Sequence, residues 1–257
     1  MDNWIDFFMS KKYNDMDIAI KRISYQAEKL ADGLTFFDFY DPSQQMHINR
    51  ELRNGYVYPY FFGGHSLCER KMLCLSSEKV DNEEKIIWPM SLCVCKINFP
   101  VDHRMVLGAV MSLGITRETL GDIIIDEDRI QIVAKDHIAQ FIAMNIEKLN
   151  NHKVHFKDSP IENIIISEPK TTFFNVSVAS LRLDAIISSA CGMSREVATE
   201  IIKKGKVKIN HEEKTKPSQI AEIGDLFSVR GIGRFLLEES IGTTKKGRIK
   251  ITIKKFV

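Results

Sequence analysis

The residues of this sequence that could carry chemistry are mostly Lys and Arg, and they concentrate toward the C-terminus. Residues 170–257 hold 17 Lys and Arg against 9 Asp and Glu, a net charge of +8, whereas residues 1–169 hold 19 against 25, a net charge of −6. Cations spaced over a surface bind the phosphates of a polyanion such as RNA, and arginine can donate two hydrogen bonds to one phosphate. We therefore predict a phosphate-binding surface formed by Arg182, Ser194, Arg195, Lys203, Lys204, Lys206, Lys208, Asn210, Arg230, Arg234, Arg248 and Lys250.

Two short helices must position the first of these residues. Apolar side chains recur at helical spacing over residues 183–190 and again over 197–202. Gly192 and Gly205 follow the two stretches, where a left-handed residue commonly ends a helix. Ser194 stands before the second stretch as its N-cap, so the first amides of that helix add donors for an anion. Two lysines of the predicted contact set fall in the last turn, where cations suit the helix dipole.

Short strands must position the other predicted residues. Residues 206–210 alternate between polar and apolar side chains, and residues 248–254 do the same, so each strand presents its basic residues on one side. Residues 225–230 indicate a further strand, and Gly231-Ile232-Gly233 after it predicts a tight bend with an arginine on either side. The C-terminal domain is thus predicted to consist of two helices and a small β-sheet that bury one apolar side and turn their cations outward.

The first 78 residues are predicted to form an α+β domain. Apolar periodicity indicates a helix near residues 16–30, and Asp41-Pro42 predicts the N-cap and first residue of a second helix near 42–53. Residues 56–62 are aromatic and strand-like, and Gly63-Gly64 marks the turn that ends them. The aromatic side chains of this stretch are interpreted as core residues.

Residues 79–168 show the order β-α-β-β-α-β. Asp102 and Asp136 are predicted as the N-caps of the two helices, and strands are predicted at 92–99, 122–126 and 129–134 and within 152–167. This order is that of the ferredoxin-like fold, which many RNA-recognition domains share. The predicted third strand carries no aromatic residue over 129–133, so we do not expect the base stacking of those domains. The chain is therefore predicted to be α+β, with domains at 1–78, 79–168 and 169–257.

Motifs in the basic region resemble the S4 RNA-binding domain. They are Arg182-Leu183-Asp184, Ser194-Arg195 with Ala198, and Ile202, Gly205, Val207, Ile209 and Asn210 in register. The rest of the chain is similar to one S4 subgroup, the YlmH-type proteins of Gram-positive bacteria. The shared segments are Phe61-Phe62-Gly63-Gly64, Glu69-Arg70-Lys71, His103-Arg104 with Val106-Leu107-Gly108-Ala109, Leu113-Gly114-Ile115 and Gly121-Asp122-Ile123. One departure is His211-Glu212-Glu213, which stands where S4 domains usually have Gly in the turn.

The resemblance implies a non-catalytic protein whose S4 domain binds structured rRNA and tRNA. For the subgroup it implies association with the large ribosomal subunit and a role in ribosome quality control on stalled peptidyl-tRNA complexes. Contact with protein quality-control factors and a genetic link to cell division also go with that subgroup. No cofactor and no small-molecule substrate are implied.

Two other classes of function stay open at this point. Arg182-Leu183-Asp184 also resembles the catalytic string of some pseudouridine synthases, which would make Asp184 a catalytic residue of an RNA-modifying enzyme. Its alternative role is a carboxylate at a helix start that orders Arg182 or Arg195. Arg195 itself is either the best single RNA contact or one partner of a salt bridge. The second class is a protein adaptor for the division machinery.

The remaining features exclude several kinds of protein. Cys93-Val94-Cys95 lacks the spacing and the further ligands of a zinc site, and the five cysteines indicate reduced, buried thiols. No stretch reaches the roughly 18 apolar residues of a membrane helix. The start, Met1-Asp2-Asn3-Trp4, is acidic and lacks the pattern of a signal peptide. We therefore expect a cytoplasmic protein without a metal site or a membrane partner.

Overall fold

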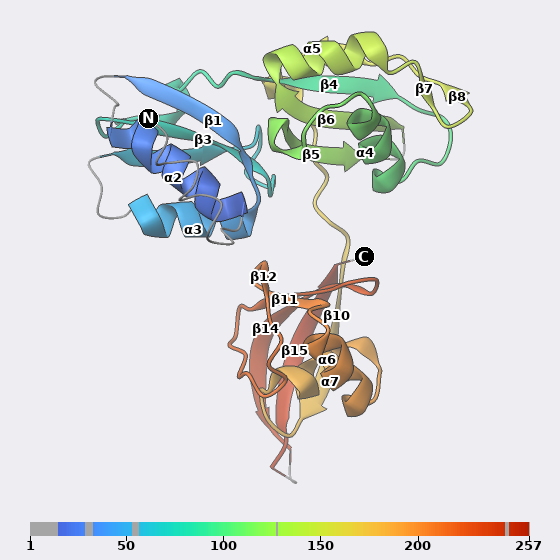
Figure 1. Cartoon of the computed structure of the whole chain (residues 1–257). Helices are drawn as coiled ribbons and strands as arrows, with labels where there is room; N and C mark the ends of the chain where they lie inside the picture. Colours follow the sequence, from blue (N-terminus) through green and yellow to red (C-terminus); the bar gives the residue numbers. More distant parts are fainter. Residues whose placement is uncertain (1–14, 29–32, 53–56, 127, 245–246, 257) are drawn as a thin grey trace, which may run out of the picture. The chain divides into compact units, whose positions relative to one another are not determined.

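A computed structural model describes residues 15–28, 33–52, 57–126, 128–244 and 247–256 (Figure 1). The chain divides into two compact units, the N-terminal unit Met1–Ser167 and the C-terminal unit Glu168–Val257. Helices accompany several antiparallel sheets, so the predicted α+β class is confirmed. The three predicted domain boundaries stay predictions.

The first sheet of the N-terminal unit lies within residues 33–52 and 57–76, and its strands are ordered β1-β3-β2. Ile23 of one helix and Ile48 of another pack with Phe37, Leu73 and Leu75 of the sheet. The predicted helices and the aromatic strand are present, although residues 29–30, 53 and 56 of these predicted elements lie outside the described residues. The strand before the second helix (β1) and the strand after the aromatic one (β3) were not predicted. The elements are α2 Asp15–Glu28, β1 Leu34–Tyr40, α3 Pro42–Leu52, β2 Tyr58–Phe62 and β3 Lys71–Ser76.

The start of α3 has the capping arrangement that the sequence predicts. The Oδ1 atom of Asp41 accepts a hydrogen bond from the backbone amide of Gln44 at 2.9 Å. In return, Oε1 of Gln44 accepts from the backbone amide of Asp41 at 2.8 Å. This reciprocal pair satisfies two amides that the first turn of a helix leaves unpaired, and Pro42 has no amide to satisfy.

Residues 90–126 and 128–159 contribute an antiparallel sheet ordered β5-β6-β4-β9. Its elements follow in the order β-α-β-β-α-β, with a short hairpin before the last strand. Asp102 accepts from the amide of Met105 at 2.8 Å and is the predicted N-cap, but the N-cap of the second helix is Lys135. Asp136 instead accepts from the hydroxyl of Ser91 at 2.6 Å. The elements are η1 Glu83–Lys85, β4 Met90–Lys96, α4 His103–Ser112, η2 Arg117–Thr119, β5 Leu120–Ile125, β6 Arg129–Lys135, α5 Asp136–Asn145, β7 Lys148–Leu149, β8 His152–Lys153, β9 Lys157–Ser159 and η3 Ile161–Asn163.

Both faces of this sheet are covered. One face shares a core with α4 and α5. On the other face, Leu92 and Val133 pack against Phe39 and Met72 of the N-terminal sheet and against Ile161 of η3. RNA-recognition domains stack bases on an open face of their sheet. Because this sheet lacks such a face, bases cannot stack on its central strands.

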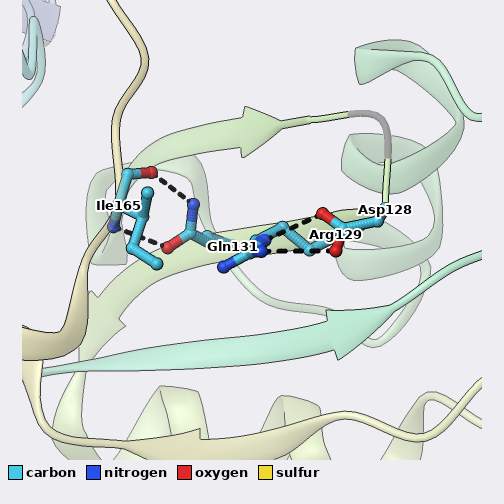
Figure 2. Close-up of polar contacts among 4 residues, drawn as sticks. All are labelled: Asp128, Arg129, Gln131 and Ile165. Atoms are coloured by element: carbon cyan, nitrogen blue, oxygen red, sulfur yellow. Dashed lines mark hydrogen bonds and ion pairs between the residues drawn. The ribbon is translucent and has the colours of Figure 1, made fainter.

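A buried glutamine closes the second face beyond η3. In Figure 2, Gln131 of β6 reaches the backbone of Ile165: its Nε2 donates to the carbonyl oxygen at 2.6 Å and its Oε1 accepts from the amide at 2.9 Å. Gln131 is 1% exposed, so these bonds satisfy a buried amide group and hold the segment after η3 against the sheet. Figure 2 also shows the exposed ion pair, at 3.0 Å, between Arg129, the first residue of β6, and Asp128, the residue before it.

The half-buried side chain of Arg70 joins the two sheets of the N-terminal unit. The guanidinium group of Arg70 donates to the carbonyl oxygens of Phe39 at 2.8 Å, Leu120 at 3.0 Å and Arg117 at 3.1 Å. Asp122 accepts from the backbone amides of Arg70 and of the residue before it, at 3.1 and 2.6 Å. Two of the motif segments that carry the YlmH resemblance therefore meet at this junction.

The C-terminal unit, described over residues 168–244 and 247–256, contains a larger sheet of six strands, ordered β10-β15-β14-β13-β11-β12. Two helices lie against each other and share a core with one face of the sheet, where Phe227, Phe235 and Ile253 are fully buried (Figure 1). The predicted helices and strands are present, but the long strand β14 was not predicted. The elements are β10 Thr171–Val178, α6 Leu183–Cys191, α7 Arg195–Lys203, β11 Val207–Ile209, β12 Glu212–Glu213, β13 Leu226–Val229, β14 Gly233–Thr243 and β15 Ile249–Phe256.

Candidate nucleic-acid interface

Three charged residues form a cluster, here called the Arg–Asp–Arg cluster, where α6 and α7 begin. Asp184 lies in the first turn of α6, and its side chain is 6% exposed. Arg182, the N-cap residue of α6, donates to both carboxylate oxygens at 3.2 and 2.8 Å. Arg195, the first residue of α7, donates to one of them at 3.0 Å. Asp184 therefore orders both arginines, which agrees with its predicted role as a carboxylate at a helix start.

The electrostatics of the cluster fit a structural carboxylate. The hydrogen bonds from Arg182 and from Arg195 lower the pKa of Asp184 to about 2, against the effect of burial, which raises it. The two arginines keep solvent contact, with 38% and 51% of their side chains exposed. A phosphate can thus approach both guanidinium groups from the solvent side while Asp184 holds them in place.

Replacing Asp184 with asparagine is expected to lower the free energy of unfolding of the C-terminal unit by about 2 kcal/mol at neutral pH. The folded-state pKa lies below the ordinary value of 3.8, so the stabilisation is complete above about pH 5 and is lost as the pH falls toward 2. Urea unfolding followed by circular dichroism at several pH values measures this. The wild-type and Asp184→Asn curves should differ near pH 7 and converge near pH 2. Equal stability at neutral pH would show that the cluster contributes nothing.

The solvent side of α7 carries the next predicted residues. Ser194 is the N-cap, and its hydroxyl accepts from the amide three residues on at 3.2 Å. Lys203 is exposed in the last turn, and Lys204 forms an ion pair with Glu200. A shallow hollow of about 560 Å³ lies along this side, lined by Arg195 and Lys203 but also by two glutamates. These glutamates therefore offset part of the positive charge along α7.

A second hollow, of about 620 Å³, collects four of the predicted cations, Lys206, Lys208, Arg230 and Arg234; we call it the basic hollow. The amide of Arg230 donates to the carbonyl oxygen of Lys206 at 2.9 Å, and Lys208 and Arg234 flank Ser228 in the strand register. The residues between these positions in β11 and β13 are buried in the core beneath the helices. Because side chains alternate along a strand, the basic hollow lies on the sheet face opposite α6 and α7.

The turn that departs from the S4 pattern is a two-residue hairpin turn. Strand pairing leaves Asn210 and His211 at the turn, with φ of 48° and 70°, the left-handed values that a type I′ turn requires. The side chain of Asn210 donates to Asp225 at 2.7 Å and accepts from the amide of Leu226 at 2.9 Å. The amide group of Asn210 is thus engaged in tying the hairpin to β13.

Glu213 brings one negative charge into the basic hollow. It lies opposite Lys208 in the strand register and lines the hollow beside the cations. Gly205, which has φ of 66°, lies beneath it, and a Cβ atom at that position would collide with the Glu213 carboxylate. The left-handed backbone conformation favours glycine at 205, whereas the exposed Glu213 side chain could move aside for a Cβ atom.

Arg248 and Lys250 lie elsewhere. Arg248 donates to the carbonyl oxygen of Ser177 in β10, and Lys250 is exposed between Ser177 and Gly242 in the strand register. Neither lines the two hollows. The predicted contact residues therefore do not share a single surface. One group lies on the helices, one surrounds the basic hollow on the opposite face of the sheet, and these two lie at the far end of β15.

Other candidate chemistries were also located. Within the described residues, no group of three or more His, Cys, Asp or Glu side chains is placed to hold a metal ion. Cys93 and Cys95 are buried in β4, and burial raises the pKa of both thiols. His103 is the exposed first residue of α4. None of the helices in the described ranges is long and apolar enough to cross a bilayer.

Comparison with known proteins identifies two matching family models. One, described as "Putative RNA-binding domain in YlmH", matches residues 91–163, and the S4 domain matches residues 181–227. The "Ribosome-associated protein quality control protein P2" of Bacillus subtilis (strain 168) is 30% identical over 223 residues, which cover 85% of this chain and 86% of that protein. Among solved structures, the "Cell division protein ylmH from Streptococcus pneumoniae" aligns with 60% of this chain and 98% of its own, with 16% identity and a TM-score of 0.48.

Proposed function

The chain belongs to the YlmH-type family of RNA-binding S4-domain proteins, and on this premise we propose that it docks on structured rRNA and tRNA of the large ribosomal subunit without catalysing a reaction. In this proposal it acts in ribosome quality control, at complexes that stall with peptidyl-tRNA, and therefore works in the cytoplasm. The name of the Bacillus relative supports the assignment to ribosome quality control.

The observation that carries the proposal is the basic hollow. Four cations from neighbouring strands surround a shallow depression. A phosphodiester backbone is bound by spaced cations, and folded RNA is recognised largely by its shape. The remaining predicted residues, Arg182, Ser194, Arg195, Lys203, Lys204, Asn210, Arg248 and Lys250, stay in the proposed interface, with Asn210 acting through the hairpin that it holds. Because the helix residues and the basic hollow lie on opposite sides of the sheet, we propose that they bind different RNA segments.

The N-terminal unit needs a different mode of contact. We propose the ferredoxin-like assignment for residues 79–168, with the sheet face closed by packing rather than open to bases. Its RNA contacts would then come from Lys148 and Lys153, the exposed cations of the β7–β8 hairpin. Phe99 stacks on His152 with 4.0 Å between ring centroids and helps to fix this hairpin. Protein quality-control factors are proposed as further partners of this net acidic unit.

The RNA-modifying alternative would require Asp184 to meet a substrate base. A catalytic carboxylate needs access to a cleft and a proton affinity suited to its task. Asp184 is instead nearly buried, holds two arginines and has a pKa of about 2. We therefore favour the binding function over catalysis at this position.

The proposal is tested by pulling the tagged full-length chain from cell lysate with and without RNase. Association through RNA predicts that large-subunit rRNA and tRNA are recovered without RNase, and that ribosomal association is lost after digestion. A division adaptor predicts the reverse, namely a protein partner retained after digestion and little RNA enriched before it. Mass analysis of rRNA and tRNA exposed to the purified chain adds a check, because a new modified nucleoside would contradict the non-catalytic assignment.

A further inference from the structure

The outer face of the C-terminal sheet, opposite α6 and α7, carries one exposed and one half-buried phenylalanine. Phe174, Ile251 and Ile253 point into the core shared with the helices, so Phe173 of β10 and Phe256 of β15 lie on the outer face. Phe173 is 58% exposed, whereas Phe256 is half-buried. Neither ring belongs to the RNA contacts proposed above.

Cations alternate with the rings on this face. Lys254 lies directly opposite Phe173 in the strand register, and its Nζ is 5.5 Å from the centre of the Phe173 ring and 5.9 Å from that of Phe256. Arg234 lies directly opposite Phe256, with its Cζ 5.6 Å from the ring centre. Arg234 also lines the basic hollow. The row Phe173, Lys254, Phe256, Arg234 therefore leads from the edge strand to the cations of the hollow.

Such a row suits unpaired nucleotides. A base stacks on an aromatic ring irrespective of its sequence, while neighbouring cations contact the backbone that links the bases. Bases inside a duplex have no free ring face to offer, so a helical RNA segment cannot use the rings. A protein partner would meet the same rings, but the flanking cations and the continuity with the basic hollow favour a polyanion.

We propose that Phe173 and Phe256 form a stacking platform for one or two unpaired bases of an RNA whose phosphates occupy the basic hollow. This inference rests on the proposed function, because it assigns a second element of the same RNA site. The cations of the hollow bind the backbone of the folded RNA, and the two rings stack on unpaired bases that extend from it. The chain thus distinguishes an RNA with a single-stranded extension from a blunt stem.

The test compares two RNA probes with the full-length chain. One is a stem-loop with a short single-stranded oligouridine extension, and the other is the same stem-loop without the extension. Phe173→Ala is expected to weaken binding of the extended probe roughly tenfold and to leave the blunt probe unchanged. The salt dependence should stay that of the wild type, because stacking removes no phosphate contact. Phe173→Trp keeps an aromatic face and should retain the preference for the extended probe.

Each outcome discriminates. Equal loss on both probes, or no loss on the extended probe, would overturn the platform while leaving the basic hollow intact. If the wild-type chain bound neither probe, the proposed RNA-binding function itself would fail. Unchanged binding of both probes by Phe173→Ala, with loss of a protein partner from an RNase-treated pull-down, would assign the face to protein docking and contradict the inference. Ultraviolet crosslinking of the extended probe should map to Phe173 or Phe256 and disappear in the corresponding alanine variant.

Discussion

Replacing Lys206, Lys208 and Arg230 together with alanine is expected to weaken RNA binding roughly 100-fold at about 0.15 M salt. These cations surround the basic hollow, and each is exposed to solvent. The slope of log K against log salt should shrink by about 0.7–0.9 for each lost phosphate contact, and thus by roughly 2–3 overall. Arg234 is left unchanged because it also packs on Phe256. Fluorescence anisotropy with a stem-loop of rRNA over a series of KCl concentrations gives both quantities.

A control variant removes the same charge from a different surface. Arg50, Lys79 and Lys85 are exposed in the N-terminal unit, and their joint replacement with alanine lowers the net charge equally. We expect the control to retain nearly all of the wild-type salt slope. An unchanged slope in the hollow variant would mean that these cations do not contact phosphate. An equal loss in the control would mean that net charge, and not the hollow, drives binding.

Arg70→Ala is expected to destabilise the N-terminal unit by about 3 kcal/mol, because it removes a half-buried charged donor from several carbonyl oxygens at once. The carbonyl oxygens of Phe39 and Arg117 lose this donor, whereas that of Leu120 keeps a hydrogen bond from Arg117 at 3.0 Å. The side chain joins the two sheets of this unit. Urea unfolding followed by tryptophan fluorescence reports on it, since both tryptophans of the chain lie within residues 1–167.

Two further variants sharpen the Arg70 prediction. Arg70→Lys keeps the charge but not the planar set of donors, so most of the loss should persist. Arg129→Ala breaks the exposed pair with Asp128 and should leave the urea midpoint nearly unchanged. If Arg70→Ala unfolded at the wild-type urea concentration, the two sheets would be held together by apolar packing alone.

Local signals in the sequence predict the helices of this chain well. Ser194, Asp102 and Asp41 each accept a hydrogen bond from the first turn of their helix, and Gly192 ends α6 in the left-handed conformation with φ of 64°. Capping acts within a few residues, so neighbouring residues encode it. Asp136 shows the limit, because its partner Ser91 lies on a distant strand and competes for the carboxylate.

The strands that sequence reasoning missed lack a one-sided pattern. β3 is buried along nearly its whole length because it lies in the middle of its sheet and has packing on both faces, so its residues do not alternate. β1 is an edge strand, but its aromatic residues pack on both faces: Phe37 lies in the core with α2 and α3, and Phe39 lies in the core with the second sheet. β14 contains bulges near Glu239 and Gly242, which break its alternation with β15. Burial from two sides and register shifts arise only in the assembled sheet, so the residues of one strand do not reveal them.

The candidate site was only partly visible in the sequence. Residue type and alternation predicted the cations of the basic hollow, because a strand fixes which neighbours share a side. They did not predict that the helices and the hollow occupy opposite faces of the sheet, since that depends on how the strands pair. The platform was missed for a similar reason. Phe173 and Lys254 are far apart along the chain and meet only through the pairing of β10 with β15.

The proposed RNA interface is tested by crosslinking the chain to RNA in living cells, followed by sequencing of the attached RNA and mapping of the crosslinked peptides. Binding at the basic hollow predicts defined sites in large-subunit rRNA and in tRNA, with crosslinks in and beside β11, β13 and the start of β14. These crosslinks should be lost in the Lys206, Lys208 and Arg230 alanine variant. Crosslinks spread over transcripts in proportion to their abundance, or ribosomal crosslinks that survive in that variant, would contradict binding at the basic hollow.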